Sequence, residues 1–452
     1  MTQAQPERYS PAALSAFQER GGTAERMDPQ KRKLSTGTIL MLIATVLVLA
    51  AAAFVLARLS SGAPADLTNI RPETVVHADH LQRETEQPHE TASVPATAEP
   101  AGIQEAEPTE QPGKSFTLTV GGTVCLAGEV RTNSYYSDVK QYDYYDTMTL
   151  LRKNLQGDLN AVFLENILST DQKASDVIAA GAAVSMLKAA GINAAACGFA
   201  KAFDKGEDGI HSTRRLLAEY GIQPVGIYEN DGNDGTQMLE INGIRTALLE
   251  YTDTIQAGTR KNMERNGQNG MIPPASAEEI RKEIAEIRER GCDAVIVLVQ
   301  WGKTGKAPDR NQKALAQKIA DAGADLIIGC GSRIVSGAET LTAAETGKQV
   351  LCVWSLGTVL SGDRSNIRRI AGMLLHVTVY TKDGRTELKD FAYTPVYTWK
   401  YRMDGRYYYR CLAANGETPD GMDTEQQKMM KRAADTVRDA MKNTGVKEYG
   451  AE

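Results

Sequence analysis

Histidine, the side chain most often used for metal binding and proton transfer near neutral pH, is scarce where this chain can fold. Three of its five histidines, His77, His80 and His89, lie in a segment rich in proline and glutamate. Only His211 and His376 remain for the region that follows. We expect His211 just before a helix and His376 within a strand. The sequence therefore predicts no metal or acid–base centre built on histidine.

Cysteine offers a second set of reactive groups, because the chain has six of them. Outside a cell they could pair as disulfides, whereas free thiols would pack as small hydrophobic groups, and the sequence leaves both alternatives open. A zinc site is not favoured, since no Cys-x-x-Cys spacing occurs. A nucleophilic role would need a base within reach, and no local pattern supplies one. The six are Cys125, Cys197, Cys292, Cys330, Cys352 and Cys411.

Carboxylates could also act in pairs, as they do in glycosidases. Glu129 and Glu165 are one such pair, but a chain with 57 acidic residues contains many others. We therefore predict no catalytic residue from the sequence, and a hydrolase with a relocated site is kept as the alternative.

Short apolar runs alternate with amphipathic segments of helical length from Phe116 onward, which is typical of an α/β sheet fold. The predicted helices cover 174–190, 212–220, 277–290, 310–322 and 424–442, the last within a helical extension over 411–452. The predicted strands cover 116–120, 160–164, 194–197, 247–251, 294–301, 325–330, 350–356 and 373–380.

An apolar segment precedes the folded region. Residues 34–57 carry no charge over 24 residues, and at about 1.5 Å per residue this length exceeds the roughly 30 Å hydrocarbon layer of a bilayer. Residues 34–58 are therefore predicted to cross the membrane once; a cleaved signal peptide would have a shorter apolar core and a small-residue cleavage site. The cations Lys31, Arg32 and Lys33 place residues 1–33 in the cytoplasm and the rest outside.

Residues 59–115 have the composition of a linker. From residue 60, they contain ten acidic residues, three basic residues and seven prolines, with almost no apolar periodicity. We expect a disordered, extended tether, with an acidic interaction tail as the alternative. The net charge of −6 and the lack of a recognisable motif argue against nucleic acid as a partner.

Several sequence blocks follow one another in an order that is itself informative. They are VGGTVCLAGEV (120–130), DLNAVFLENILS (158–169), the stretch 189–226, VIVLVQWGK (295–303), AGADLIIGCGSRIVSGAE (322–339), WSLGTVL (354–360) and YTPVY (393–397). Together they resemble the CapA-type poly-γ-glutamate capsule synthesis family, a branch of the calcineurin-like metallophosphatase fold. The resemblance covers roughly residues 116–400.

The resemblance implies a layered α/β/β/α sandwich over residues 116–410, with two metal ions that activate water for attack on phosphorus. This sequence departs from the family's ligand pattern at most positions. Of the polar residues in that pattern, only those at Glu165 and Asp204 are retained. We therefore expect a degenerate member without a cofactor, although weak binding of Ca²⁺ or Mg²⁺ stays open. The pattern's opening Asp falls on Gly122 or Thr123, its Asn-His pair on Ala200 and Lys201, its later histidines on Gln300, Cys330, Gly331 and Arg333, and its closing Asn on Thr358.

The loops that hold metal in the family would here form a cleft with cations and hydrogen-bonding groups. By resemblance, we expect a protein of a bacterial cell envelope that binds an anionic polymer such as poly-γ-glutamate during capsule synthesis, without catalysis. Membrane proteins of capsule synthesis are the other expected partners, and scaffolding of these is a further alternative. Replacing Glu165 or Arg333 should weaken polymer binding and leave thermal stability nearly unchanged. The candidate residues are Glu129, Glu165, Asn166, Lys201, Asp204, Gln300, Arg333 and Thr358, with Arg131, Lys205, Lys303 and Arg364 as further cations.

Overall fold

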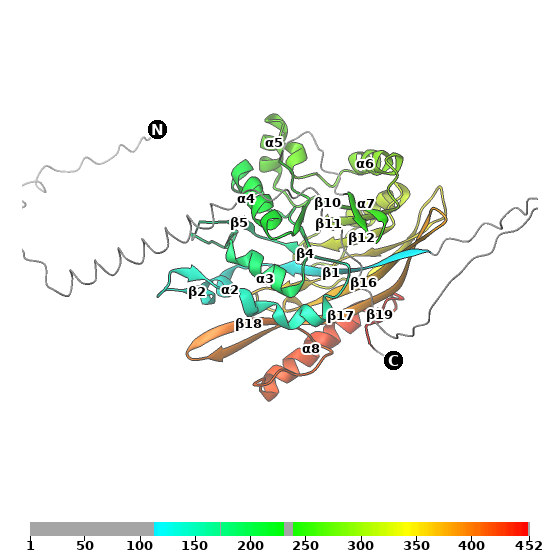
Figure 1. Cartoon of the computed structure of the whole chain (residues 1–452). Helices are drawn as coiled ribbons and strands as arrows, with labels where there is room; N and C mark the ends of the chain where they lie inside the picture. The colour runs from blue at the N-terminus through cyan, green and yellow to red at the C-terminus, as the bar shows by residue number, and fades with distance from the viewer. Residues whose placement is uncertain (1–112, 172, 230–237, 451–452) are drawn as a thin grey trace, which may run out of the picture. The chain divides into compact units, whose positions relative to one another are not determined.

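A computed structural model describes residues 113–171, 173–229 and 238–450. The predicted cytoplasmic tail, the membrane segment and all but the last residues of the linker lie outside these ranges. Within them, no helix combines the length and the apolar character needed to cross a membrane. Two β-sheets make up the centre of the described region, and helices lie against them (Figure 1).

The larger sheet is mixed, in the order β18-β17-β16-β1-β4-β7-β8. Strands β1, β4, β7 and β8 run parallel, and β16, β17 and β18 are antiparallel neighbours. Its strands are β1 (Lys114–Val124), β4 (Leu159–Leu164), β7 (Ala194–Ala196), β8 (Gln223–Val225), β15 (Thr358–Leu360), β16 (Ala371–Lys382), β17 (Arg385–Met403), β18 (Arg406–Ala413) and β19 (Lys447–Glu448).

The smaller sheet has the order β13-β14-β12-β11-β10-β9, and its four central strands are parallel. Its strands are β9 (Met238–Ile241), β10 (Ile244–Thr252), β11 (Ala294–Gln300), β12 (Leu326–Cys330), β13 (Ala338–Thr342) and β14 (Gln349–Val353). Two short pairs stand apart: β2 (Tyr135–Tyr136) with β3 (Gln141–Tyr142), and β5 (Ile167–Ser169) with β6 (Ile178–Ala180).

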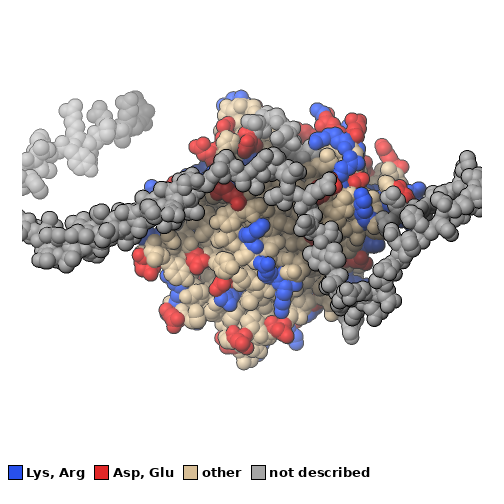
Figure 2. Space-filling view, in the orientation of Figure 1, with Lys and Arg blue, Asp and Glu red and all other residues tan. Residues whose placement is uncertain are grey.

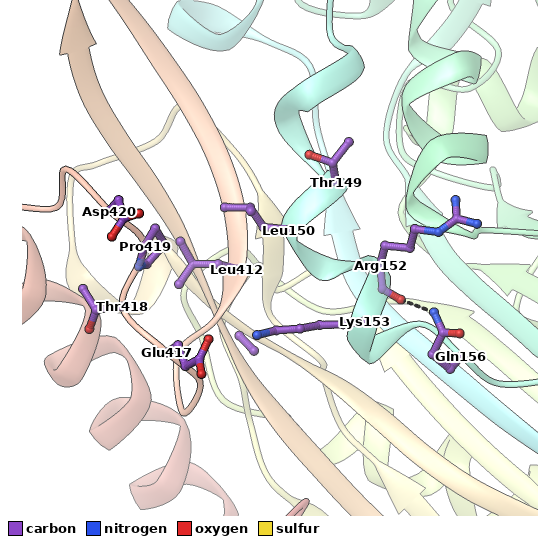
Figure 3. A pocket seen from close by; sticks show the side chains of 11 residues that line it. Thr149, Leu150, Arg152, Lys153, Gln156, Leu412, Glu417, Thr418, Pro419 and Asp420 are labelled. Atoms are coloured by element: carbon purple, nitrogen blue, oxygen red, sulfur yellow. Dashed lines mark hydrogen bonds between the residues drawn. The ribbon is translucent and has the colours of Figure 1, made fainter.

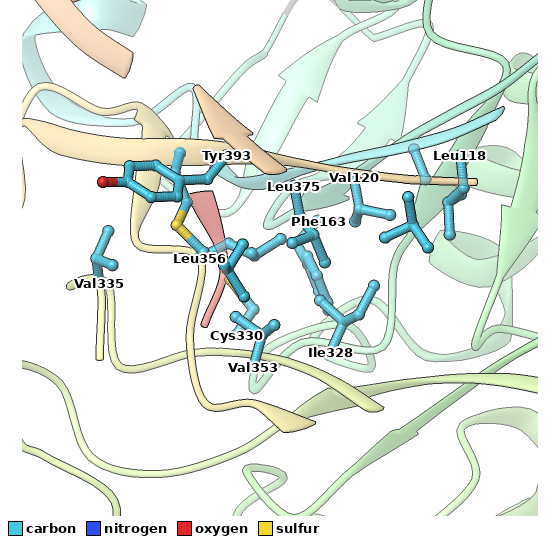
Figure 4. Packing of buried hydrophobic residues seen from close by; sticks show 14 of the residues in the cluster. Leu118, Val120, Phe163, Ile328, Cys330, Val335, Val353, Leu356, Leu375 and Tyr393 are labelled. Atoms are coloured by element: carbon cyan, nitrogen blue, oxygen red, sulfur yellow. The ribbon is translucent and has the colours of Figure 1, made fainter. Parts of the chain in front are cut away.

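Buried side chains of both sheets share one hydrophobic cluster, so the sheets pack face to face. Figure 4 shows Val120 and Phe163 of the larger sheet close to Ile328 and Val353 of the smaller one. The central strands β4, β11 and β12 alternate their side chains between two buried faces, which explains why they read as continuous apolar runs. In β11, for example, Ile296 joins this cluster, whereas Val297 joins the cluster beneath the outer helices.

The helices cover the outer faces. The larger sheet packs against α3 and α4, and the smaller sheet packs against α6 and α7. The start of α7 is fixed by a capping box in which Asp309 is the N-cap residue. Helix α8 lies along β16 and β17. The helices are α2 (Gly128–Asn133), α3 (Ala182–Ala190), α4 (Gly206–Glu219), α5 (Ala257–Arg265), α6 (Ala277–Glu289), α7 (Arg310–Asp321) and α8 (Thr424–Met441); short 3₁₀ helices are η2 (Tyr145–Thr147), η3 (Thr149–Asn154), η4 (Asn269–Met271) and η5 (Ile367–Arg369).

The predicted mixed α/β class is confirmed, and a strand occurs at each predicted strand position. The predicted helix over 174–190 is wrong in its first half, where residues 178–180 form β6. The helix predicted from residue 212 in fact begins at Gly206. The prediction started too late because glycine is a poor helix former, and two glycines lie in the first turn. The predicted division at residue 410/411 falls inside β18, and α8 contributes Met430 and Val437 to the cluster between the sheets.

Candidate functional site

A cleft of about 790 Å³ opens at the carboxyl ends of the parallel strands β4, β10, β11 and β12. Parallel strands direct their carboxyl ends to one edge of a sheet, and loops there often hold binding sites. Four of the eight candidate residues, Glu165, Lys201, Gln300 and Arg333, line this cleft, and so does Lys303, one of the further cations. They come from segments far apart in the sequence, so the fold brings them together.

Glu165 directly follows β4 and lies at the floor of the cleft, where it is 6% exposed. Its Oε1 accepts hydrogen bonds from Thr123 Oγ1 at 3.1 Å and from Gln300 Nε2 at 3.0 Å. Its Oε2 forms an ion pair with the Arg333 guanidinium. Both carboxylate oxygens are therefore already bonded to protein groups, which compensates the cost of burying the charge.

Arg333 lies in the loop that follows β12, three residues after Cys330, the last residue of that strand. Its φ of 58° lies in the left-handed region, which non-glycine residues seldom adopt. The conformation is held in part by Thr358, whose Oγ1 donates to the Arg333 carbonyl at 3.1 Å. Burial acts to lower the pKa of Arg333, but the charge and hydrogen bond of Glu165, together with the nearby thiols of Cys125 and Cys330, raise that pKa overall, so the guanidinium stays charged.

The end of β1 completes the floor. A Cβ at Gly122 would lie 2.4 Å from the carbonyl oxygen of Gly357, so only glycine fits there. The next residue of β1, Thr123, donates its hydroxyl hydrogen bond to Glu165. Its Oγ1 also lies 3.1 Å from Cys330 Sγ. These contacts close the floor with neutral donors where the family resemblance places metal ligands.

The donor set of this floor does not fit the two-metal centre that the resemblance implies. The described residues contain no group of three or more His, Cys, Asp or Glu side chains placed to hold a metal ion. Glu165 is the one carboxylate of the floor, and a guanidinium already neutralises it. Amide and hydroxyl oxygens such as those of Gln300 and Thr123 are weak ligands for transition metals.

The mouth of the cleft is built differently. Lys201, Asp253, Lys303 and Asp309 line it and are all exposed. Although Asp253 is exposed as a residue, the protein atoms around its carboxylate partly desolvate it, and this desolvation together with the charge of Asp309 raises its pKa to about 6. Asp176 also lines the cleft, but it pairs with Arg131 at 3.2 Å.

The other predicted residues lie outside the cleft lining. Glu129 on α2 forms an ion pair with Lys400, which together with a hydrogen bond from Tyr409 lowers the pKa of Glu129. Asn166 is fully buried beside the floor, where its Oδ1 accepts from the Leu126 N–H at 2.7 Å. Asp204 is exposed in the turn before α4, and Thr358 acts from behind the floor through Arg333.

The sequence reasoning missed three acidic residues of the cleft lining: Asp176, Asp253 and Asp309. Two of them had a usable signal. Asp253 comes directly after a predicted strand, and Asp309 precedes a predicted helix, where it acts as the cap. Asp176 lay inside a segment that was predicted to be helical, which concealed its place in a loop.

The histidines and cysteines lie in structural positions. His211 is within α4, not before a helix start, and its Nε2 lies 3.3 Å from the carbonyl oxygen of Glu229. His376 contacts Thr119 and Thr394, and burial lowers its pKa to about 4. All six cysteines are buried free thiols, as in the second of the two alternatives left open by the sequence. Burial raises the pKa of Cys125, the one nearest the cleft, to about 11.

A second hollow, of about 760 Å³, lies between η3, the end of β18 and the loop before α8 (Figure 3). Leu150, Leu412 and Pro419 give it an apolar wall, and Lys153 and Glu417 lie at its rim. None of the predicted site residues lines it. The face shown in Figure 2 carries Lys, Arg, Asp and Glu side by side, so no single charge dominates that face.

Comparison with known proteins assigns the chain to a family. Residues 117–363, just over half of the chain, match the sequence model described as bacterial capsule synthesis protein PGA_cap. The chain belongs to the PGA_cap family. This agrees with the CapA-type resemblance found from the sequence blocks.

Curated relatives of this PGA_cap protein include the capsule biosynthesis protein CapA of Bacillus anthracis, 30% identical over 34% of this chain and 36% of that protein. The PGA biosynthesis protein CapA of Bacillus subtilis (strain 168) is 30% identical over 28% of this chain and 33% of that protein. The chain thus spans about a third of the length of these relatives. A crystal structure of a hypothetical protein from Thermus thermophilus is similar at a TM-score of 0.37 and 13% identity, over 65% of this chain and 99% of that one.

Proposed function

We propose that this PGA_cap protein is a membrane-anchored, non-catalytic component that binds an anionic envelope polymer of the poly-γ-glutamate type during capsule synthesis. In this proposal, residues 34–58 anchor the chain, residues 59–115 form the tether, and the described domain is a calcineurin-like metallophosphatase fold without metals. The names of the two CapA relatives support the process. The two facing sheets with outer helices support the fold type.

One observation carries the non-catalytic part of the proposal. Both carboxylate oxygens of Glu165 are bonded to Arg333, Thr123 and Gln300, at the place where the family pattern has metal ligands. The partly buried guanidinium of Arg333 supplies the positive charge that a metal ion would otherwise bring to this carboxylate. Above this floor, the exposed cations Lys201 and Lys303 could hold carboxylates of a polymer by charge-assisted hydrogen bonds.

The test is binding of poly-γ-glutamate of defined length to the full-length chain in detergent micelles, by calorimetric titration with and without EDTA. We expect affinity that EDTA does not change. The Lys201→Gln, Lys303→Gln double variant should bind about tenfold more weakly at low salt. A matched control, Lys431→Gln with Lys447→Gln, removes two exposed cations away from the cleft and should bind as the wild type does. Absence of binding, or binding abolished by EDTA, would overturn the proposal.

A hydrolase is the second candidate function, and one observation favours it. Asp253, with its pKa near 6, lies in the same cleft as Asp309. A carboxylic acid with a raised pKa beside a second carboxylate is a usual acid–base arrangement. The test is release of shortened chains from the same polymer over hours, which the Asp253→Asn variant should abolish if this candidate is correct.

A further inference from the structure

The cleft presents acidic as well as basic side chains to a ligand. Four acidic side chains line it, namely Glu165, Asp176, Asp253 and Asp309, against three cations. Two of the acids are neutralised, Glu165 by Arg333 and Asp176 by Arg131. Asp253 and Asp309 are left, and among the described residues neither forms an ion pair.

These two carboxylates are held in place by backbone groups. The Gly302 N–H bonds to the Asp253 carboxylate, and Asp309 accepts from the N–H groups of Asn311 and Gln312 at the start of α7. Backbone N–H groups orient the carboxylates but leave their negative charges without a cation. The two charges are close enough for Asp309 to affect the ionisation of Asp253.

An independent observation adds a third acceptor. Gln300 is 3% exposed and lines the cleft, and its Oε1 has no hydrogen-bond partner among the described residues. Its Nε2 donates to Glu165, which fixes the orientation of the amide and leaves Oε1 as an acceptor. The Asp253 N–H bonds to the Gln300 carbonyl at 3.1 Å, so the two residues are neighbours across β10 and β11. A buried polar atom without a partner destabilises the fold, and an N–H donor from a ligand would satisfy it.

We propose that the cleft binds a primary ammonium group, with Asp253, Asp309 and Gln300 Oε1 as its three acceptors and Lys201 and Lys303 as partners for a carboxylate of the same ligand. An ammonium group has three N–H donors, which matches the three acceptors. The ligand class is therefore an amino-acid-type zwitterion. This inference rests on the proposed function and deepens it by naming the part of the polymer that binds. In a γ-linked glutamate polymer an interior unit has an amide in place of the amine, so only the terminal unit can offer an ammonium group. The cleft would bind the amino end of the chain and not its middle.

The experiment compares three probes with the full-length chain in detergent micelles by calorimetric titration: γ-glutamyl-glutamate with a free amine, its N-acetyl derivative, and glutarate. The free-amine dipeptide should bind at least about tenfold more tightly than the other two. Asp253→Asn and Asp309→Asn should each remove this preference, since asparagine keeps the acceptor and the helix cap but not the charge. Asp383→Asn is the matched control, a charge removal in the β16–β17 turn, away from the cleft.

Two outcomes would overturn the inference. If the N-acetyl derivative binds as tightly as the free amine while long polymer still binds through Lys201 and Lys303, the chain-end inference fails and the proposed function stands. If neither the probes nor the polymer bind, both fail. A preference for the free amine that survives both the Asp253→Asn and the Asp309→Asn substitution would also contradict the assignment of the acceptors.

Discussion

The floor and the mouth of the cleft use charged residues in opposite ways. At the floor, Glu165 and Arg333 are joined to each other, and Thr123 and Gln300 hold the carboxylate. At the mouth, Lys201, Asp253, Lys303 and Asp309 are exposed, and among the described residues they form no ion pairs. The charges at the floor therefore stabilise the fold, whereas the charges at the mouth are available to bind a ligand.

This difference changes what a substitution at each level should do. A floor charge that loses its partner stays buried and costs free energy of folding, whereas an exposed charge returns to water at little cost. The expectation that Glu165 or Arg333 could be replaced with thermal stability nearly unchanged no longer follows, because Glu165 is buried within an ion pair.

The largest effect is expected at the floor. Glu165→Ala would leave Arg333 without its anion and Thr123 and Gln300 without their acceptor, and we expect a loss of about 3 kcal/mol in the free energy of unfolding. The Arg333 side chain is 31% exposed, which keeps the loss at the low end for a buried pair. Urea unfolding of the full-length chain in micelles measures it. The control is Glu129→Ala, whose half-exposed pair with Lys400 should cost less than about 1 kcal/mol. Equal losses in the two variants would contradict the distinction.

A buried carboxylate without a cation provides a second comparison. Glu250 of β10 is 2% exposed and accepts from the Gly198 N–H at 2.8 Å, and burial raises its pKa from 4.5 to about 8. The folded state therefore keeps a proton that the unfolded chain releases. Its contribution to stability is complete below pH 4.5 and is lost as the pH rises to about 8.

Glu250→Gln should therefore flatten the pH dependence of stability. Between about pH 5 and pH 8 the wild type should lose on the order of 2 kcal/mol more than the variant, a difference that thermal melts at several pH values would show. Glu240→Gln, at an exposed position on β9, is the control and should leave the pH profile as in the wild type. Parallel profiles for the wild type and Glu250→Gln would show that Glu250 is ionised in the folded protein.

The smallest effect on stability is expected at the mouth. Because the pKa of Asp253 is raised to about 6, its ionisation slightly disfavours the fold as the pH rises from about 4 to above 6. Asp253→Asn should therefore raise Tm slightly at about pH 7.5 and leave it unchanged at about pH 4, as melting curves at the two pH values would show. A large fall in Tm would place Asp253 with the floor residues.

Much of the fold could be predicted from the sequence because buried parallel strands leave strong apolar runs. NAVFL and AVIVLVQW, for example, fall on β4 and β11. The helix start at Gly206 could not, because two glycines weaken its helical pattern. At the site, the motif blocks led to Glu165, Gln300 and Arg333. The ion pair between Glu165 and Arg333 depends on how two distant loops meet, which no local pattern contains. Asp253 and Asp309 were missed because no motif includes them.

The most direct test of the metal-free floor is the metal content of the full-length chain. The protein would be incubated with Mn²⁺, Zn²⁺ and Fe²⁺, dialysed to remove free ions, and measured by mass spectrometry. With Glu165 already bound by Arg333, we predict close to zero ions per chain and a Tm that EDTA does not change. One or two tightly held ions per chain, lost together with stability on addition of EDTA, would contradict the account.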